Sequence, residues 1–80
     1  MQLTVLLFAS YAEALGTARL ELTVPERTVV GELVERLRAV AGAGRLPPRP
    51  LVAVNRRYAA YDHPLTASDE VAVIPPVAGG

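Results

Sequence analysis

One stretch of the sequence repeats its apolar residues with the spacing of a long helix, and this limits the folds that the chain can adopt. Between positions 30 and 41 the apolar residues recur at i, i+3, i+4 and i+7, while charged residues occupy the other side. Thr28 is a suitable N-cap, and Gly42 and Gly44 end the pattern. The sequence therefore predicts one main amphipathic helix, whose apolar face must be covered by the rest of the chain.

Most of the remaining segments are short and favour strands. Residues 2–8 are rich in apolar β-formers without helical spacing, and residues 19–24 alternate apolar and polar side chains. Residues 51–55 and 71–74 are predicted as further buried strands, the second of which must end at the proline pair that follows. Tyr58 is expected to open a short edge strand after a turn.

Shorter signals place the connections. Ser10 and Glu13 have capping-box spacing and Gly16 can close a turn, so residues 9–15 are predicted to form a brief helix. Residues 45–50 carry three prolines and should form an irregular surface connection. Residues 59–69 are expected to be a loop, with a possible helical turn near Pro64 and Leu65.

The order of these segments is β, short α, β, α, β, β, β. It predicts an α+β domain in which a mixed sheet is crossed on one face by the main helix, the β-grasp or ubiquitin-like roll. A ferredoxin-like or other small α+β domain is also compatible with this length and order. We expect residues 1–76 to form the single domain and residues 77–80 to be a flexible tail.

Composition excludes several classes of function. The 80 residues include no cysteine, so neither disulfides nor thiolate metal sites are possible, and a reducing, cytoplasmic location is expected. The eight basic residues are all arginine and balance eight acidic ones, which disfavours nucleic-acid binding. No apolar run reaches the roughly 18 residues of a membrane span, so no membrane is expected as a partner. The absence of lysine disfavours a modifier that forms chains on itself.

Side chains that could catalyse a reaction are sparse. His63 is the single histidine, and a loop histidine beside one acid is usually a surface residue. Ser10 and Ser68 have no evident base partner, and Asp69-Glu70 precedes a strand, where solvation accounts for it. Metal-ligand spacing is missing too, so no bound metal is expected. The chain is therefore not expected to be catalytic alone.

The sequence finishes on Gly79-Gly80, directly after Pro75-Pro76-Val77-Ala78. Glycine loses the most backbone entropy on folding and packs no side chain, so a double glycine contributes little to a domain. A carboxylate without neighbouring side chains can, however, thread a narrow active-site channel. On the dipeptide alone, a chance ending or a remnant of cloning is the simpler interpretation.

The context of this ending resembles a known family. The sequence is similar to the small subunit of molybdopterin synthase at residues 5–10, at residues 24–25 with 28–29, and above all at residues 73–80. The similarity spans the whole chain. Ile74 departs from the phenylalanine that is common in that family, which affects packing against a partner rather than the carrier chemistry.

The resemblance implies a chemistry for Gly80. In that family an adenylating enzyme uses ATP to activate the terminal glycine, and sulfur from a donor protein then gives a thiocarboxylate. The resemblance implies that the chain itself binds no cofactor. The thiocarboxylate donates sulfur to a pterin precursor in the active site of the large subunit, the expected partner.

The resemblance also implies a tail and a partner-binding surface, formed by Pro75, Pro76, Val77, Ala78, Gly79 and Phe8. Arg56 or Arg57 is expected at the rim of this surface. For Phe8, a place in the core is favoured over a place on the partner surface. Two alternatives remain open. One is a sulfur carrier for thiamin, tRNA thiolation or amino-acid synthesis, and the other is a ubiquitin-like protein modifier.

Overall fold

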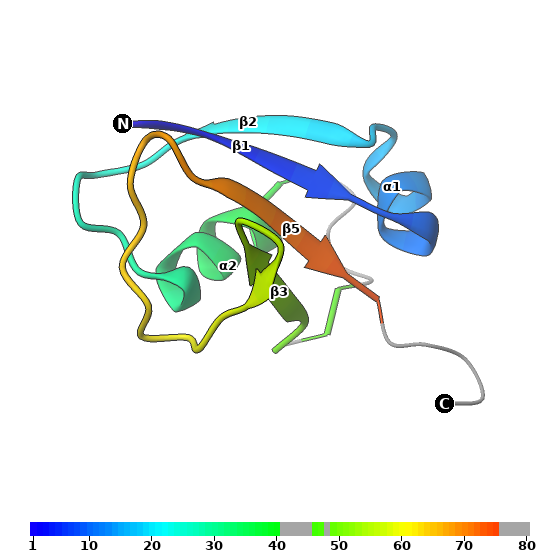
Figure 1. Ribbon diagram of the computed structural model, residues 1–80. Helices are drawn as coiled ribbons and strands as arrows, with labels where there is room; N and C mark the ends of the chain where they lie inside the picture. Colours follow the sequence, from blue (N-terminus) through cyan, green and yellow to red (C-terminus); the bar gives the residue numbers. More distant parts are fainter. Residues whose placement is uncertain (41–45, 48, 76–80) are drawn as a thin grey trace.

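The structure is a computed structural model, and it describes residues 1–40, 46–47 and 49–75. Its elements follow the predicted order (Figure 1): β1 (Gln2–Leu7), α1 (Ala9–Leu15), β2 (Arg19–Thr23), α2 (Val30–Arg38), β3 (Leu51–Val54), β4 (Arg57–Tyr58) and β5 (Glu70–Ile74). The two glycines predicted to end the main helix, Gly42 and Gly44, lie outside the described residues. So do residues 76–80, and the division of the chain at position 76 stays a prediction.

The five strands form one mixed sheet in the order β2-β1-β5-β3-β4. The first and last strands, β1 and β5, pair in parallel at its centre, and all other neighbours are antiparallel. The main helix, α2, crosses one face of this sheet (Figure 1). This is the β-grasp arrangement, so the predicted α+β fold is confirmed.

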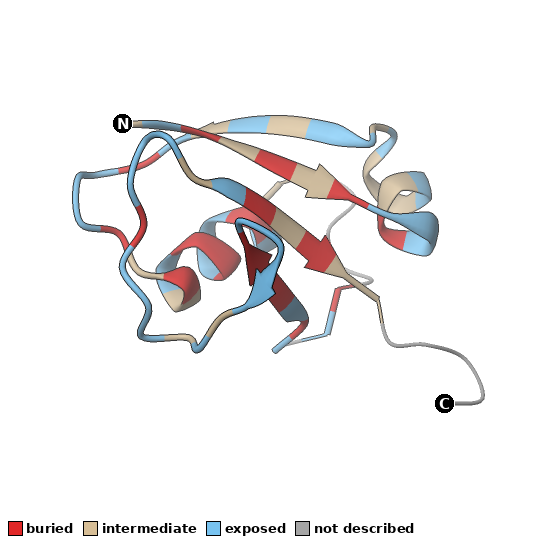
Figure 2. Ribbon diagram, in the orientation of Figure 1, coloured by how far each residue is buried: buried red, intermediate tan, exposed pale blue. Residues whose placement is uncertain are grey.

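The core lies between the sheet and α2, as the alternation of strand residues requires. One side of each central strand is buried, including Leu3, Val5 and Leu7 of β1 (Figure 2). The apolar face of α2 covers them with the residues that the periodicity selects, namely Val30, Leu33, Val34 and Leu37. Burying each such side chain stabilises the fold by about 1.5–3 kcal/mol. The packing of α2 on the inner face therefore leaves the opposite, outer face of the sheet in a fixed position.

The start of α1 differs from the prediction. Its bounds are those predicted, and Gly16 closes it in the left-handed conformation at φ 76°. The N-cap, however, is Phe8, whose side chain makes no capping hydrogen bond. The prediction of a capping box formed by Ser10 and Glu13 is therefore wrong. The helix begins one residue before Ser10 because the chain turns directly out of β1.

The start of α2 is capped by a distant loop rather than by Thr28. The N-cap is Val29, whose N–H donates to Glu32 Oε1 at 3.0 Å. The N–H groups of Val30 and Gly31 donate to the carbonyls of His63 and Tyr61 at 3.0 and 2.9 Å. Thr28 is buried and its hydroxyl donates to the Pro25 carbonyl at 2.7 Å, so it is not the N-cap.

Three other boundaries move by a few residues. The main helix ends at Arg38, before the last residues of the apolar pattern. Asn55 belongs to the turn after β3, whereas Arg57 already belongs to β4. The helical turn expected near Pro64 is absent from the described structure, because Pro64 instead forms an isolated β-bridge with Val29.

Candidate functional site

The described chain leaves the sheet at the end of β5. Ile74 is the last residue of that strand, and both Ile74 and Pro75 are partly buried. The predicted tail residues Pro76, Val77, Ala78, Gly79 and Gly80 lie outside the described residues, so their roles stay predictions. The part of the candidate site that the structure places is the surface beside this exit.

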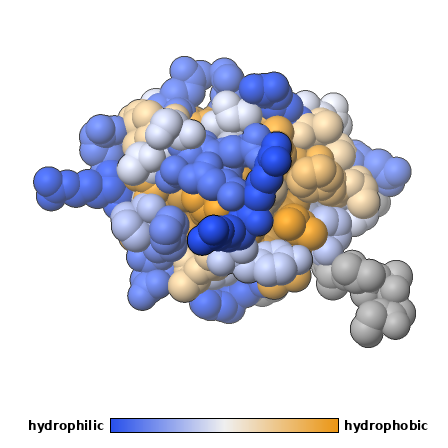
Figure 3. Space-filling view, viewed as in Figure 1, coloured by the Kyte–Doolittle hydropathy of each residue, from blue (hydrophilic) through white to orange (hydrophobic). Residues whose placement is uncertain are grey.

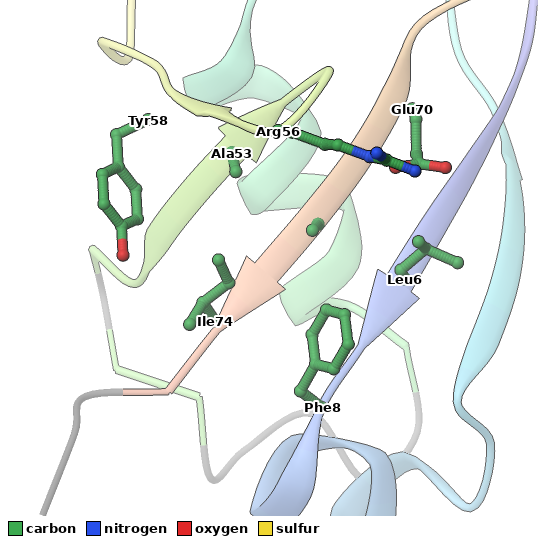
Figure 4. Close-up of a pocket in the computed structure, with 8 residues that line it drawn as sticks. Leu6, Phe8, Ala53, Arg56, Tyr58, Glu70 and Ile74 are labelled. Atoms are coloured by element: carbon green, nitrogen blue, oxygen red, sulfur yellow. The ribbon is translucent and has the colours of Figure 1, made fainter.

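A shallow hollow of about 370 Å³ lies on the outer face of the sheet, opposite α2. Figure 4 shows the side chains that line it, which come from β1, β3, β4, β5 and their ends: Leu6, Phe8, Ala53, Arg56, Tyr58, Glu70, Ala72 and Ile74. Strand register brings them together, because Ala72 is paired with Leu6 on one side and with Ala53 on the other. We call this set of residues the outer hollow.

The outer hollow is rich in exposed apolar surface. Phe8 and Tyr58 are 48% and 72% exposed, which is unusual for side chains of this size. In Figure 3, apolar side chains gather over the centre of this face and polar ones cross it. A contiguous apolar patch between polar side chains is typical of a protein interaction site.

Phe8 therefore belongs to the surface, and its assignment to the core is wrong. Leu7 is the last inward-facing residue of β1, and Phe8 continues extended at φ −125° and ψ 152° before α1 begins. The alternation of an extended chain turns Phe8 to the outer side. Phe8 and Ile74 both line the outer hollow, so the structure brings together one predicted partner residue and the end of β5 that leads into Pro75.

The two arginines expected at the rim line different hollows. Arg56 lines the outer hollow, whereas Arg57 lines a neighbouring one with Ala59, Ala60 and His63. Sequence reasoning missed Leu6, Tyr58 and Ala72 as surface residues of this site. The signal that could have found Leu6 and Ala72 is the residue parity in β1 and β5, which places both opposite the buried set. Tyr58 joins them through its pairing with Ala53, which only the sheet register reveals.

The turn before β5 is held by a carboxylate rather than by solvation alone. Asp69 accepts hydrogen bonds from the Thr66 N–H at 2.8 Å and from Asn55 Nδ2 at 2.9 Å. The bond from the Thr66 backbone is the largest influence, and it holds the pKa of Asp69 below its ordinary value against the opposing effect of partial burial. Asp69 is thus a structural anion that fixes the start of β5.

Other sequence candidates occupy ordinary positions. His63 is exposed, and its carbonyl caps α2. Ser68 Oγ lies 3.3 Å from the hydroxyl oxygen of Thr66, and within the described ranges neither hydroxyl is hydrogen-bonded to a base that could activate it as a nucleophile. Across residues 1–40, 46–47 and 49–75 no group of three or more possible ligands could hold a metal ion. Nor does this part of the chain contain a helix with the length and apolarity to cross a membrane.

Comparison with known proteins gives one family. The model of the ThiS family matches residues 5–80. The molybdopterin synthase sulfur carrier subunit of Escherichia coli strain K12 is 38% identical over 82 residues, which cover 95% of this chain and 96% of that protein.

Solved structures agree with this family. SAMP1 from Haloferax volcanii superposes on this chain with a TM-score of 0.84 at 29% identity, and the alignment covers 100% of both chains. A second structure from that organism names the protein as small archaeal modifier protein 1. The putative molybdopterin converting factor subunit 1 from Pyrococcus furiosus gives a TM-score of 0.82 at 26% identity, covering 96% of this chain and 99% of that one. The β-grasp body, the full-length matches and the expected resemblance thus agree, and the chain belongs to the ThiS family.

Proposed function

We propose that this chain is the sulfur carrier subunit of a molybdopterin synthase and that the carboxyl group of Gly80 carries the sulfur. The observation that carries the proposal is the near full-length match to the Escherichia coli sulfur carrier subunit of that enzyme. The Pyrococcus furiosus neighbour, named as subunit 1 of a molybdopterin converting factor, supports the same assignment. Both names describe a subunit, which supports a second subunit as the partner of this chain.

The chemistry begins at a poor electrophile. A carboxylate oxygen of Gly80 bonds to the α-phosphorus of ATP on an activating enzyme, and pyrophosphate leaves. Sulfide, as HS⁻, then attacks the carbonyl carbon, and AMP, a good leaving group, departs with the bonding electrons, which leaves a thiocarboxylate and releases one proton. The sulfur sits on the main chain, so a protein without cysteine can carry it.

The position of the exit suits delivery to a partner. Residues 77–80 can span at most about 13 Å, at roughly 3.3 Å per extended residue. Proline fixes φ near −65° and cannot continue a strand, so Pro75 and Pro76 favour a chain that leaves the sheet. The outer hollow borders this exit through Ile74 and Phe8, and it is the surface on which we expect the large subunit to dock. Catalytic side chains for sulfur insertion would belong to that subunit.

The test is mass spectrometry of the chain after reaction with its activating enzyme, MgATP and a sulfide source. We expect a mass increase that corresponds to exchange of one oxygen for sulfur, located on Gly80 by fragmentation. Deleting Gly80 should abolish this product without lowering thermal stability, because every described strand ends by Ile74. Gly79→Ala should slow loading, because a side chain next to the reacting carbon hinders the enzyme's approach. Normal loading of the deletion variant would contradict the proposal.

A second candidate function is a ubiquitin-like protein modifier. The Haloferax volcanii neighbour that favours it is named as a modifier and matches this fold with the TM-score of 0.84 given above. In this case Gly80 would be joined to lysines of other proteins. Fragment spectra of cell extracts would then contain an isopeptide to Gly80, whereas the carrier gives only the thiocarboxylate.

Carriers for thiamin, tRNA thiolation or amino-acid synthesis would use the same activation of Gly80. They differ in the protein that receives the sulfur. Copurification of the tagged chain from its own cells separates them, because a molybdopterin synthase carrier should retain a larger synthase subunit. Recovery of a tRNA-thiolating enzyme in its place would overturn the first choice.

A further inference from the structure

The turn between β3 and β4 places an arginine where glycine is the usual residue. Two residues, Asn55 and Arg56, connect the strands, and both have positive φ, at 52° and 70°. A two-residue hairpin with positive φ at both positions is a type I′ turn, which strongly prefers Asn-Gly. Asparagine is at its preferred position, but Arg56 holds a left-handed conformation that disfavours any residue with a Cβ. Backbone strain of this kind is often retained where a side chain has a function.

The turn is fixed to β5 by Asn55. Its N–H donates to the Glu70 carbonyl at 2.8 Å, and its side-chain oxygen accepts from the Glu70 N–H at 2.9 Å. Its amide nitrogen donates to Asp69 at 2.9 Å. With three hydrogen bonds on the preceding residue, the backbone of Arg56 has a fixed position relative to the sheet.

From this position Arg56 reaches over the outer hollow. Figure 4 shows its side chain extending across β5 towards the end of the hollow where Glu70 lies. Arg56 is exposed, and within the described part of the chain it makes no ion pair at 4.0 Å or less. The outer hollow is therefore apolar around Phe8 and Ile74 and carries an available guanidinium at its other end.

We propose that Arg56 is a specificity-determining contact that donates paired hydrogen bonds to a carboxylate of the large subunit. This inference rests on the proposed function, which supplies the partner and its docking face. A guanidinium is planar, weakly hydrated and matched to a carboxylate by two parallel N–H groups, so it is well suited to an interface. Glu70 repels a carboxylate placed nearer β1, so the two charges together set the docking register.

The test measures binding of the full chain to the purified large subunit of the same organism, by calorimetry at low and high salt. We expect Arg56→Ala to weaken binding by about 10–30-fold, as for a desolvated arginine contact. The charge reversal Arg56→Glu should weaken it further, because two carboxylates would then meet. The salt dependence of binding should also decrease in both variants.

Arg57 supplies the matched control. It is the next residue in the chain, carries the same charge and is also exposed, but it lines the neighbouring hollow. We expect Arg57→Ala and Arg57→Glu to change the Kd by less than about threefold, as is usual for rim charges. Equal losses in the two series would show a general charge effect and would overturn the specific contact.

Arg56→Gly separates binding from folding. Glycine relieves the left-handed strain, so the Tm should rise by about 4 °C, while binding weakens as in Arg56→Ala. A variant that is more stable and yet binds more weakly cannot owe its loss to misfolding. If the wild-type chain does not bind the large subunit, the proposed function and this inference both fail. If it binds and the Arg56 variants bind equally well, this inference alone fails.

Discussion

At the scale of single residues, Asn55 is the side chain on which the turn after β3 depends. It joins the turn to Asp69 and Glu70 and also adopts positive φ. We expect Asn55→Ala to lower the free energy of unfolding by about 1–3 kcal/mol, through lost hydrogen bonds and added strain. Asn55→Gly loses the same hydrogen bonds without the strain, so it should be more stable than the alanine variant by about 1 kcal/mol. Urea denaturation measures both, and equal stability would show that the conformation does not matter.

Asp69 makes stability depend on acidity. The Thr66 N–H and the Asn55 amide favour its charged form, and together they hold its pKa below the ordinary value in the folded state. A depressed folded pKa adds stability that is complete above the unfolded pKa of about 4. That stability is lost as the pH falls further, through the folded pKa. Asp69→Asn should therefore be less stable than wild type at pH 7 and lose less stability on acidification to pH 3.

The pH profile of unfolding checks this prediction. Asp62 offers a control, because it is an exposed loop carboxylate that makes no hydrogen bond among the described residues. Asp62→Asn should leave the acid limb of the profile unchanged. An acid limb that is equally steep in wild type and Asp69→Asn would assign the acid sensitivity to other groups.

At the scale of elements, α2 holds the sheet in shape. Leu37 is fully buried in the core, whereas the next residue, Arg38, is exposed. Leu37→Ala should destabilise the protein by about 2–5 kcal/mol because it leaves a cavity, a large part of the about 5–15 kcal/mol of a typical domain. Arg38→Ala should stay within about 0.5 kcal/mol of wild type. Chemical denaturation of the two variants compares them, and similar midpoints would contradict the assignment of the helix face.

The elements also show what sequence reasoning can reach. The type and order of the helices and strands were predicted correctly because apolar periodicity is local and survives in the fold. The predicted N-cap of α2 is wrong because the first N–H groups of this helix donate to the carbonyls of Tyr61 and His63, some thirty positions away. No local signal in the sequence reveals these partners. Boundaries that depend on tertiary contacts are beyond a pattern read along the chain.

The candidate site likewise has one part that the sequence predicts and one part that depends on tertiary structure. The role proposed for Gly79 and Gly80 comes from the sequence and its resemblance to a family, and it stays a prediction because both residues lie outside the described structure. The outer hollow does not follow from the sequence, because it exists only when β1, β5 and β3 are placed side by side in register. Phe8 shows the difference: its residue type favours the core, and only the end of β1 and the start of α1 turn it outward. The choice between Arg56 and Arg57 likewise depends on turn geometry.

At the scale of the whole molecule, the stabilising core and the proposed docking surface lie on opposite faces of one sheet. The inner face packs on α2, and the outer face carries the outer hollow (Figures 2 and 3). Substitutions on the two faces should therefore have opposite effects. A core substitution such as Leu37→Ala lowers stability, and the folded fraction that remains should bind the large subunit with unchanged affinity.

Phe8→Ala should do the reverse. Because Phe8 is half exposed, truncation should change the free energy of unfolding by less than about 1 kcal/mol, while a central aromatic contact is worth about tenfold or more in Kd. Leu51→Ala is the comparison, since Leu51 is exposed to nearly the same extent, 49% against 48% for Phe8, but pairs with Ile74 beside the outer hollow rather than lining it. Calorimetric titration of the large subunit with each variant, beside thermal denaturation, makes the comparison. If Leu51→Ala weakened binding as much as Phe8→Ala, the docking surface would extend across β5 to Leu51, the cross-strand partner of Ile74, and if neither did, the partner would bind elsewhere.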